Sequence, residues 1–134
     1  MGDPGSEQPS VDAHGIRPPS VYAIEARATR AGVAVLTLEG EFDLAAAQAV
    51  HDQLAAARGG GARGVVLDMA EVTFVDSSVL RELLRAEAAL HADGTPLVLA
   101  ALRPPVARLL ELTRTAGLLT VAPTLEAALQ RAGA

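Results

Sequence analysis

The stretch that decides the fold is residues 64–92, GVVLDMAEVTFVDSSVLRELLRAEAALHA, because it passes from the pattern of a strand to the pattern of a helix. Its first part, Val65-Val66-Leu67, is a short continuous apolar run, which is typical of a buried strand. A loop is expected from Glu71 to Val75. Asp76-Ser77-Ser78 then begins a helix with a broad apolar stripe that suits packing on a sheet. This stripe has two neighbouring rows: Leu80, Leu84 and Ala88, then Val79, Leu83, Ala86 and Leu90.

On the N-terminal side, two strands and a helix are expected. A short strand opens at Val21, and a second strand covers residues 33–38 after a turn at residues 30–32. These strands are expected to pair as a hairpin. Asp43 has the character of an N-cap, and apolar residues behind it recur at helical spacing up to the glycines at 59–61. These apolar residues are Ala47, Val50, Leu54 and Ala57.

On the C-terminal side, the same alternation continues. Residues 96–100 predict a buried strand, and Pro104 and Pro105 begin a helix with its C-cap at Gly117. Residues 118–121 predict a short strand, and Thr124 caps a last helix. Strands that alternate with helices predict an α/β fold, a mixed β-sheet of four to five strands with about four α-helices.

The length of 134 residues favours one domain. Residues 1–19 are rich in Pro, Gly, Ser and Asp and lack periodicity, so we expect a disordered N-terminal leader followed by a domain at residues 20–134.

Charge and hydropathy exclude several classes of partner. The net charge of -5 disfavours nucleic acid, because an acidic protein repels the phosphate backbone. No apolar run reaches the roughly 18 residues that cross a bilayer, so direct membrane insertion is not expected. The first 15 residues lack the apolar core of a secretory signal, and the chain has no cysteine. We therefore expect a cytoplasmic protein.

The residue types also argue against an enzyme or a bound cofactor. All 11 basic residues are arginine, and the chain has no lysine, asparagine or cysteine, which excludes a Schiff-base lysine, a phosphate-loop lysine and a Cys-His-Asn triad. The three histidines, His14, His51 and His91, lie far apart and show no ligand spacing. Residues 59–64 fit G-x-G-x-x-G, but these glycines follow a helix and precede a strand, which reverses the order that nucleotide binding needs.

Ser77 and Ser78 are the only serines after Ser20, and they stand at a predicted helix start. Asp76 or Ser77 could simply cap the helix. A hydroxyl in this position is also open to a kinase, and a phosphate there would face the positive end of the helix dipole. Arg81 lies one turn further on and could approach the phosphate, whereas Asp76 would oppose it.

Three segments, in order and at suitable spacings, resemble the STAS domain family, most closely the bacterial anti-sigma-factor antagonists. The resemblance covers roughly residues 33–129. Residues 38–43, LEGEFD, are similar to the family's G-E-[LF]-D signature, and residues 66–68 with 72–78, VTFVDSS, resemble the strand and phosphoacceptor signature. Residues 105–109, followed by Ala116-Gly117-Leu118, are similar to the family's late helix.

The resemblance implies a binding protein that needs no cofactor of its own. Ser77 would be the phosphoacceptor. The partner, an anti-sigma factor that is itself a serine kinase, would bind the unphosphorylated chain and release its sigma factor; phosphorylation would end the complex, and a phosphatase would restore it. ATP and magnesium would belong to the kinase. The implied partner-binding residues are Glu41, Asp43, Asp76, Ser77, Ser78, Val79 and Arg81.

One position departs from the family pattern, because Val79 stands where glycine usually follows the D-S-S run. A β-branched residue there could narrow access for a kinase. The alternative interpretation is an accessory STAS subunit of a membrane lipid-transport ABC complex, which is not phosphorylated.

Overall fold

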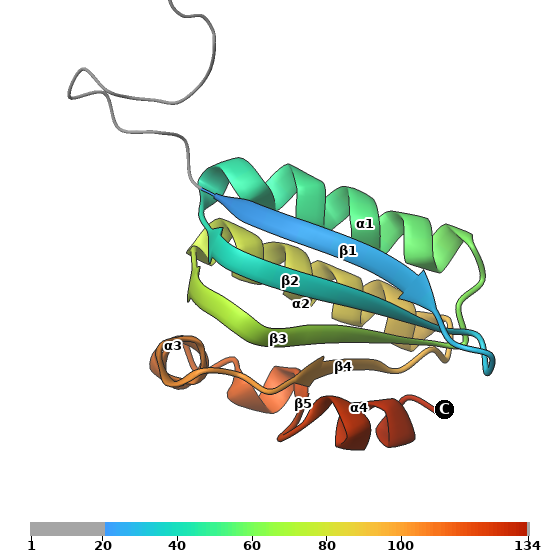
Figure 1. Ribbon diagram of the computed structural model, residues 1–134. Coiled ribbons are helices and arrows are strands. Elements are labelled where there is room, and N and C mark those ends of the chain that lie inside the picture. The colour runs from blue at the N-terminus through green and yellow to red at the C-terminus, as the bar shows by residue number, and fades with distance from the viewer. Residues whose placement is uncertain (1–20, 134) are drawn as a thin grey trace, which may run out of the picture.

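Five strands form a single mixed sheet in the order β1-β2-β3-β4-β5 in the computed structural model, which describes residues 21–133 (Figure 1). β1 and β2 form the expected antiparallel hairpin, and β2 through β5 are parallel. The mixed α/β fold predicted from the sequence is confirmed. The strands are β1 (Tyr22–Ala28), β2 (Val33–Phe42), β3 (Gly64–Val75), β4 (Leu97–Ala100) and β5 (Thr120–Ala122).

Within residues 21–133, four α-helices and two short 3-10 helices accompany the strands. The predicted leader at residues 1–19 lies outside the described residues. Thr124 is the predicted N-cap of α4, and its side chain accepts from the N–H three residues later, whereas Asp43 caps the short η1 that precedes α1 and accepts from the N–H two residues later. The elements are η1 (Leu44–Ala46), α1 (Ala47–Gly59), α2 (Ser77–Ala92), α3 (Pro104–Leu112), η2 (Ala116–Leu118) and α4 (Leu125–Arg131).

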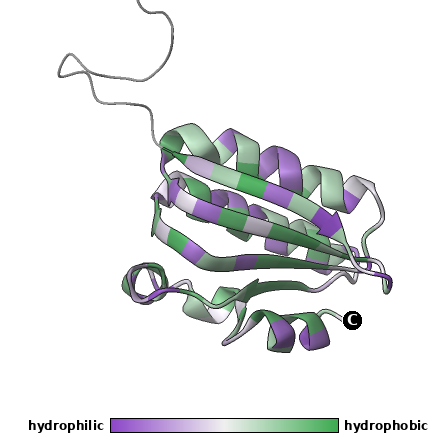
Figure 2. Cartoon of the chain, in the orientation of Figure 1, coloured by the Kyte–Doolittle hydropathy of each residue, from purple (hydrophilic) through white to green (hydrophobic). Residues whose placement is uncertain are grey.

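Two apolar clusters lie on the two faces of the sheet. The larger one joins Leu67 and Leu99 of the central strands to Val50 of α1 and Leu83 of α2. The smaller one joins the opposite-facing valines of β2, β3 and β4 to alanines of α4. Figure 2 shows hydrophobic residues along the central strands, whereas the helices carry polar residues among them. The core therefore sits between α1 and α2 and the sheet, as the stripe of residues 79–90 predicts.

The loop expected from Glu71 to Val75 is wrong, because β3 continues to Val75. Val72 and Val75 are buried, and this half of β3 pairs with residues 39–42 of β2. The pairing shifts register between Thr37 and Glu39 and again between Gly40 and Glu41. These irregularities let a segment without a regular alternation of apolar residues continue the sheet.

The predicted C-cap at Gly117 is also wrong. α3 ends at Leu112, and Arg114 adopts a positive φ of 61° just after it, a conformation that glycine usually supplies. The Thr115 hydroxyl is buried and donates to the Leu110 carbonyl at 3.4 Å, which helps to close the helix end. Gly117 instead lies inside η2, and the following strand begins at Thr120 rather than at Leu118.

Candidate functional site

The carboxyl ends of β2 and β3 bring the two predicted signature segments to one edge of the sheet. Phe42 and Val75 face each other in the ladder and are buried. The Asp76 N–H donates to the Phe42 carbonyl at 2.8 Å, which joins the end of β2 to the start of α2. This edge therefore carries Glu41 and Asp43 from one segment and Asp76 and Ser77 from the other, as the resemblance implies.

Asp76 is the N-cap of α2 and is held in place by Ser78. One carboxylate oxygen accepts from the Ser78 N–H at 2.8 Å and from the Ser78 hydroxyl at 2.5 Å. The hydrogen bond from the Ser78 hydroxyl, followed by the one from its N–H, lowers the pKa of Asp76, and the positive charge of Arg81 acts in the same direction. Asp76 is thus a fixed carboxylate at the beginning of the helix.

Ser77 is the first residue of α2, and its side chain is exposed. Its hydroxyl makes no hydrogen bond to any residue from 21 to 133, whereas the Ser78 hydroxyl is occupied by Asp76. Of the two serines, Ser77 therefore offers the accessible hydroxyl to a protein that docks on this edge.

Asp43 and Glu41 occupy the neighbouring strand end. Asp43 is half-buried, and one of its carboxylate oxygens accepts from the Ala45 N–H at 3.0 Å, so it shapes the turn into α1. Glu41 is exposed, and its N–H donates to the Val21 carbonyl at 3.1 Å. Glu41 is opposite Phe74 in the β2–β3 ladder.

Val79 must be removed from the predicted partner-binding residues. Its side chain is only 1 % exposed and belongs to the main core, because the first turn of α2 directs it between the helix and the sheet. Arg81 is exposed on the same helix. Val79 therefore fills the interior where the family usually has glycine, and its bulk does not cover the Ser77 hydroxyl from outside.

Sequence reasoning misses two exposed residues at this edge. Leu44 is 71 % exposed and Phe74 is 47 % exposed. Phe74 falls in the segment expected to be a loop, and Leu44 follows the N-cap without belonging to the helical stripe. A large apolar residue close to each signature carboxylate, at Asp43-Leu44 and at Phe74-Val75-Asp76, is the signal that could have found them.

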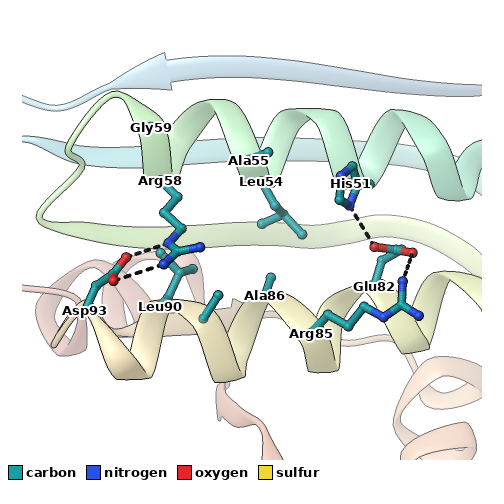
Figure 3. Close-up of a pocket in the computed structure, with 11 residues that line it drawn as sticks. His51, Leu54, Ala55, Arg58, Gly59, Glu82, Arg85, Ala86, Leu90 and Asp93 are labelled. Carbon is teal, nitrogen blue, oxygen red and sulfur yellow. Dashed lines mark hydrogen bonds and ion pairs between the residues drawn. The ribbon is translucent and has the colours of Figure 1, made fainter.

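A separate groove of about 480 Å³ lies between α1 and α2 (Figure 3). Arg58 binds Asp93 with two hydrogen bonds of 2.6 and 3.1 Å, which raises the pKa of Arg58 and lowers that of Asp93. Glu82 contacts His51 at 3.0 Å and Arg85 at 3.4 Å. These polar side chains contact one another, and the groove contains none of the predicted site residues.

Two further observations concern metal-ligand groups and membrane-spanning helices. Residues 21–133 contain no group of three or more His, Cys, Asp or Glu side chains that could hold a metal ion. No helix in this range is long and apolar enough to cross a membrane. The edge of β2 and β3 remains the place where the predicted residues meet.

Comparison with known proteins gives one family and many related folds. The family model of the STAS domain matches residues 25–128. No curated protein sequence matches the chain. Among solved structures, an anti-sigma factor antagonist from Mycobacterium paratuberculosis is 25% identical with a TM-score of 0.77, over 87% of this chain and 98% of that chain.

Two other solved structures share the fold at lower identity. The cell fate determinant SpoIIAA from Bacillus, in its phosphorylated form, is 22% identical with a TM-score of 0.64, over 81% of this chain and 98% of that chain. A sulfate transporter family protein from Wolinella succinogenes is 19% identical with a TM-score of 0.68, over 79% of this chain and 88% of that chain.

Proposed function

The chain belongs to the STAS domain family, and from this premise we propose that it is an anti-sigma-factor antagonist switched by phosphorylation of Ser77. The unphosphorylated chain binds an anti-sigma factor that is a serine kinase, and this complex frees the sigma factor. The observation that carries the proposal is the exposed Ser77 hydroxyl, which has no hydrogen bond within residues 21–133 and stands beside the fixed carboxylate of Asp76.

The switch step is a phosphoryl transfer that the partner performs. The Ser77 oxygen bonds to the γ-phosphorus of ATP, the bond to ADP breaks, and the hydroxyl proton passes to a base of the kinase. The chain supplies only the acceptor and its docking surface, so ATP and magnesium belong to the partner. In this proposal the chain is a binding protein rather than an enzyme.

The local charges support a switch that leaves the fold intact. A phosphate on Ser77 faces the positive N-terminal end of α2 and lies on the helix that carries Arg81. Glu41 and Asp76 supply negative charge at the same edge. The domain therefore tolerates the dianion, whereas a partner that covers this edge meets two further negative charges.

Purified chain is incubated with each serine-kinase anti-sigma factor encoded in the same genome and ATP, and the modified residue is located by mass spectrometry. We expect phosphate on Ser77, none on the Ser77→Ala variant, and normal modification of the matched Ser78→Thr variant, which keeps a hydroxyl for Asp76. A complex should form with the unmodified chain only, and a phosphatase should restore it. The absence of both phosphate and complex with every kinase would remove the proposal.

The alternative function is an accessory subunit of a membrane lipid-transport complex; the fold also occurs in a protein of a different transporter class, the sulfate transporter family. In that case the chain would co-purify with a transporter ATPase, and the Ser77→Asp variant would bind it as well as the wild type does. Loss of binding in that variant would argue against the transporter role.

A further inference from the structure

Three of the six large hydrophobic side chains that are exposed within residues 21–133 lie at the edge that carries Ser77. They are Val21, Leu44 and Phe74, with exposed fractions of 78 %, 71 % and 47 %. Isolated exposed apolar residues are common on soluble proteins, whereas apolar residues gathered around one polar site indicate an interaction surface.

Backbone contacts place these three residues around the signature segments. The Val21 carbonyl accepts from the Glu41 N–H, and Glu41 is opposite Phe74 in the β2–β3 ladder, so Glu41 lies between Val21 on one side and Phe74 of β3 on the other. Leu44 lies in η1, which packs against α2. We call Val21, Leu44 and Phe74 the apolar rim.

The negative charge beside the apolar rim limits which class of partner can bind there. Glu41 and Asp76 make this edge acidic, and an acidic surface repels anionic lipid headgroups. A second copy of the chain would bring the same carboxylates together across a symmetric interface. The complementary surface is therefore a different protein, with apolar pockets and a cationic side chain that faces Glu41.

We propose that Leu44 and Phe74, with Val21 beside them, anchor the anti-sigma kinase on the chain. This inference rests on the proposed function and deepens it, since it assigns the binding free energy to exposed apolar residues at the same strand ends as the acceptor serine. Hot spots of protein interfaces are large side chains that become fully desolvated near the centre, with polar groups around them.

The same arrangement explains why phosphate ends the complex. In the bound state the apolar rim excludes water from the space around Ser77, and a carboxylate already stands beside it at Asp76. A dianion on Ser77 would then lose hydration while it faces like charge, which disfavours the complex. In the free chain the exposed phosphate stays hydrated, so the domain itself is not destabilised.

The test measures the affinity of the full chain for its kinase, with a non-hydrolysable ATP analogue to keep Ser77 unmodified. Leu44→Ala and Phe74→Ala are compared with Leu112→Ala and Leu118→Ala, which truncate leucines that are 69 % and 60 % exposed elsewhere. We expect the dissociation constant to rise about tenfold or more for each rim variant and less than about threefold for each control. Thermal melting of the four variants should match the wild type.

The possible outcomes separate the two proposals. Tight wild-type binding that survives both rim substitutions would overturn the apolar rim and leave the proposed function standing. No binding of the wild type to any kinase would overturn the proposed function and the rim with it. Equal weakening in the rim and control variants would also contradict the inference, because it would place no special contact at the Ser77 edge.

Discussion

Replacing Gly40 by alanine should destabilise the domain at the strand end that carries Glu41 and Asp43. Gly40 has a φ of +100°, and a Cβ atom there would lie 2.3 Å from the Val21 carbonyl oxygen and 3.2 Å from the Tyr22 Cα. Real Cβ atoms do not approach backbone so closely, so the start of β1 must move. That movement breaks the hydrogen bond from the Glu41 N–H to Val21.

The expected magnitude combines three effects. A non-glycine residue at this φ costs about 1–2 kcal/mol, forced displacement of packed backbone costs about 1–3 kcal/mol, and the lost hydrogen bond costs about 0.5–1.5 kcal/mol. We expect a loss of about 3–5 kcal/mol in the free energy of unfolding. This loss is a large part of the total stability of an ordinary domain.

The matched control is Gly61→Ala, because Gly61 also has a positive φ, +74°, but no heavy atom lies within 4 Å of the position that a Cβ atom would take there. It should lose only about 1–2 kcal/mol from the backbone strain. Urea unfolding with linear extrapolation measures both variants. If Gly40→Ala and Gly61→Ala lose equal stability, the reasoning about the close approach of β1 is refuted.

Three more predictions concern the start of α2. Ser77→Asp should abolish binding to the kinase while the melting temperature stays near that of the wild type, since an acidic residue at an exposed helix N-terminus contributes about 0.3–1 kcal/mol; global unfolding in circular dichroism would contradict this. Val79→Gly should lose about 2–4 kcal/mol in urea unfolding, because a buried side chain is removed and helical glycine is unfavourable, and an unchanged midpoint would show that the buried valine adds nothing. Because folding lowers the pKa of Asp76 below its ordinary value of 3.8, the carboxylate stabilises the fold fully above pH 3.8 and loses this effect as the pH falls through the pKa of the folded state. The stability advantage of the wild type over Asp76→Asn should therefore shrink on acidification below pH 3.8. An advantage that stays constant with pH would contradict this prediction.

Local signals in the sequence are enough to predict most of the fold. Thr124 caps α4 as expected, Asp43 caps the short η1 just before the expected helix, and the turn before Val33 joins an antiparallel hairpin. These features depend on residues close together in the chain. The length of β3 depends instead on residues far away in the chain, because Val72 and Val75 pair with residues of β2 across two register shifts. No local pattern encodes that partner.

In the candidate site, too, the sequence predicts some features, whereas only the folded structure shows others. The residue pattern places Ser77 at a helix start, the resemblance implies that it is the phosphoacceptor, and the structure shows that its side chain is exposed. Helical spacing places Val79 in the apolar stripe of α2, and its burial agrees with that stripe and not with the partner-binding role that the resemblance implies. Leu44 and Phe74 are missed because large apolar residues are expected to be buried, and only the folded structure shows that these two are exposed.

The most direct test of the central claim is the affinity of the full chain for the anti-sigma kinase proposed as its partner, measured by calorimetry before and after phosphorylation of Ser77. We expect the unmodified chain to bind and the phosphorylated chain to bind at least about thirtyfold more weakly, which corresponds to about 2 kcal/mol, while both forms melt at similar temperatures. Equal affinity of the two forms would contradict the claim that the exposed Ser77 hydroxyl is the switch.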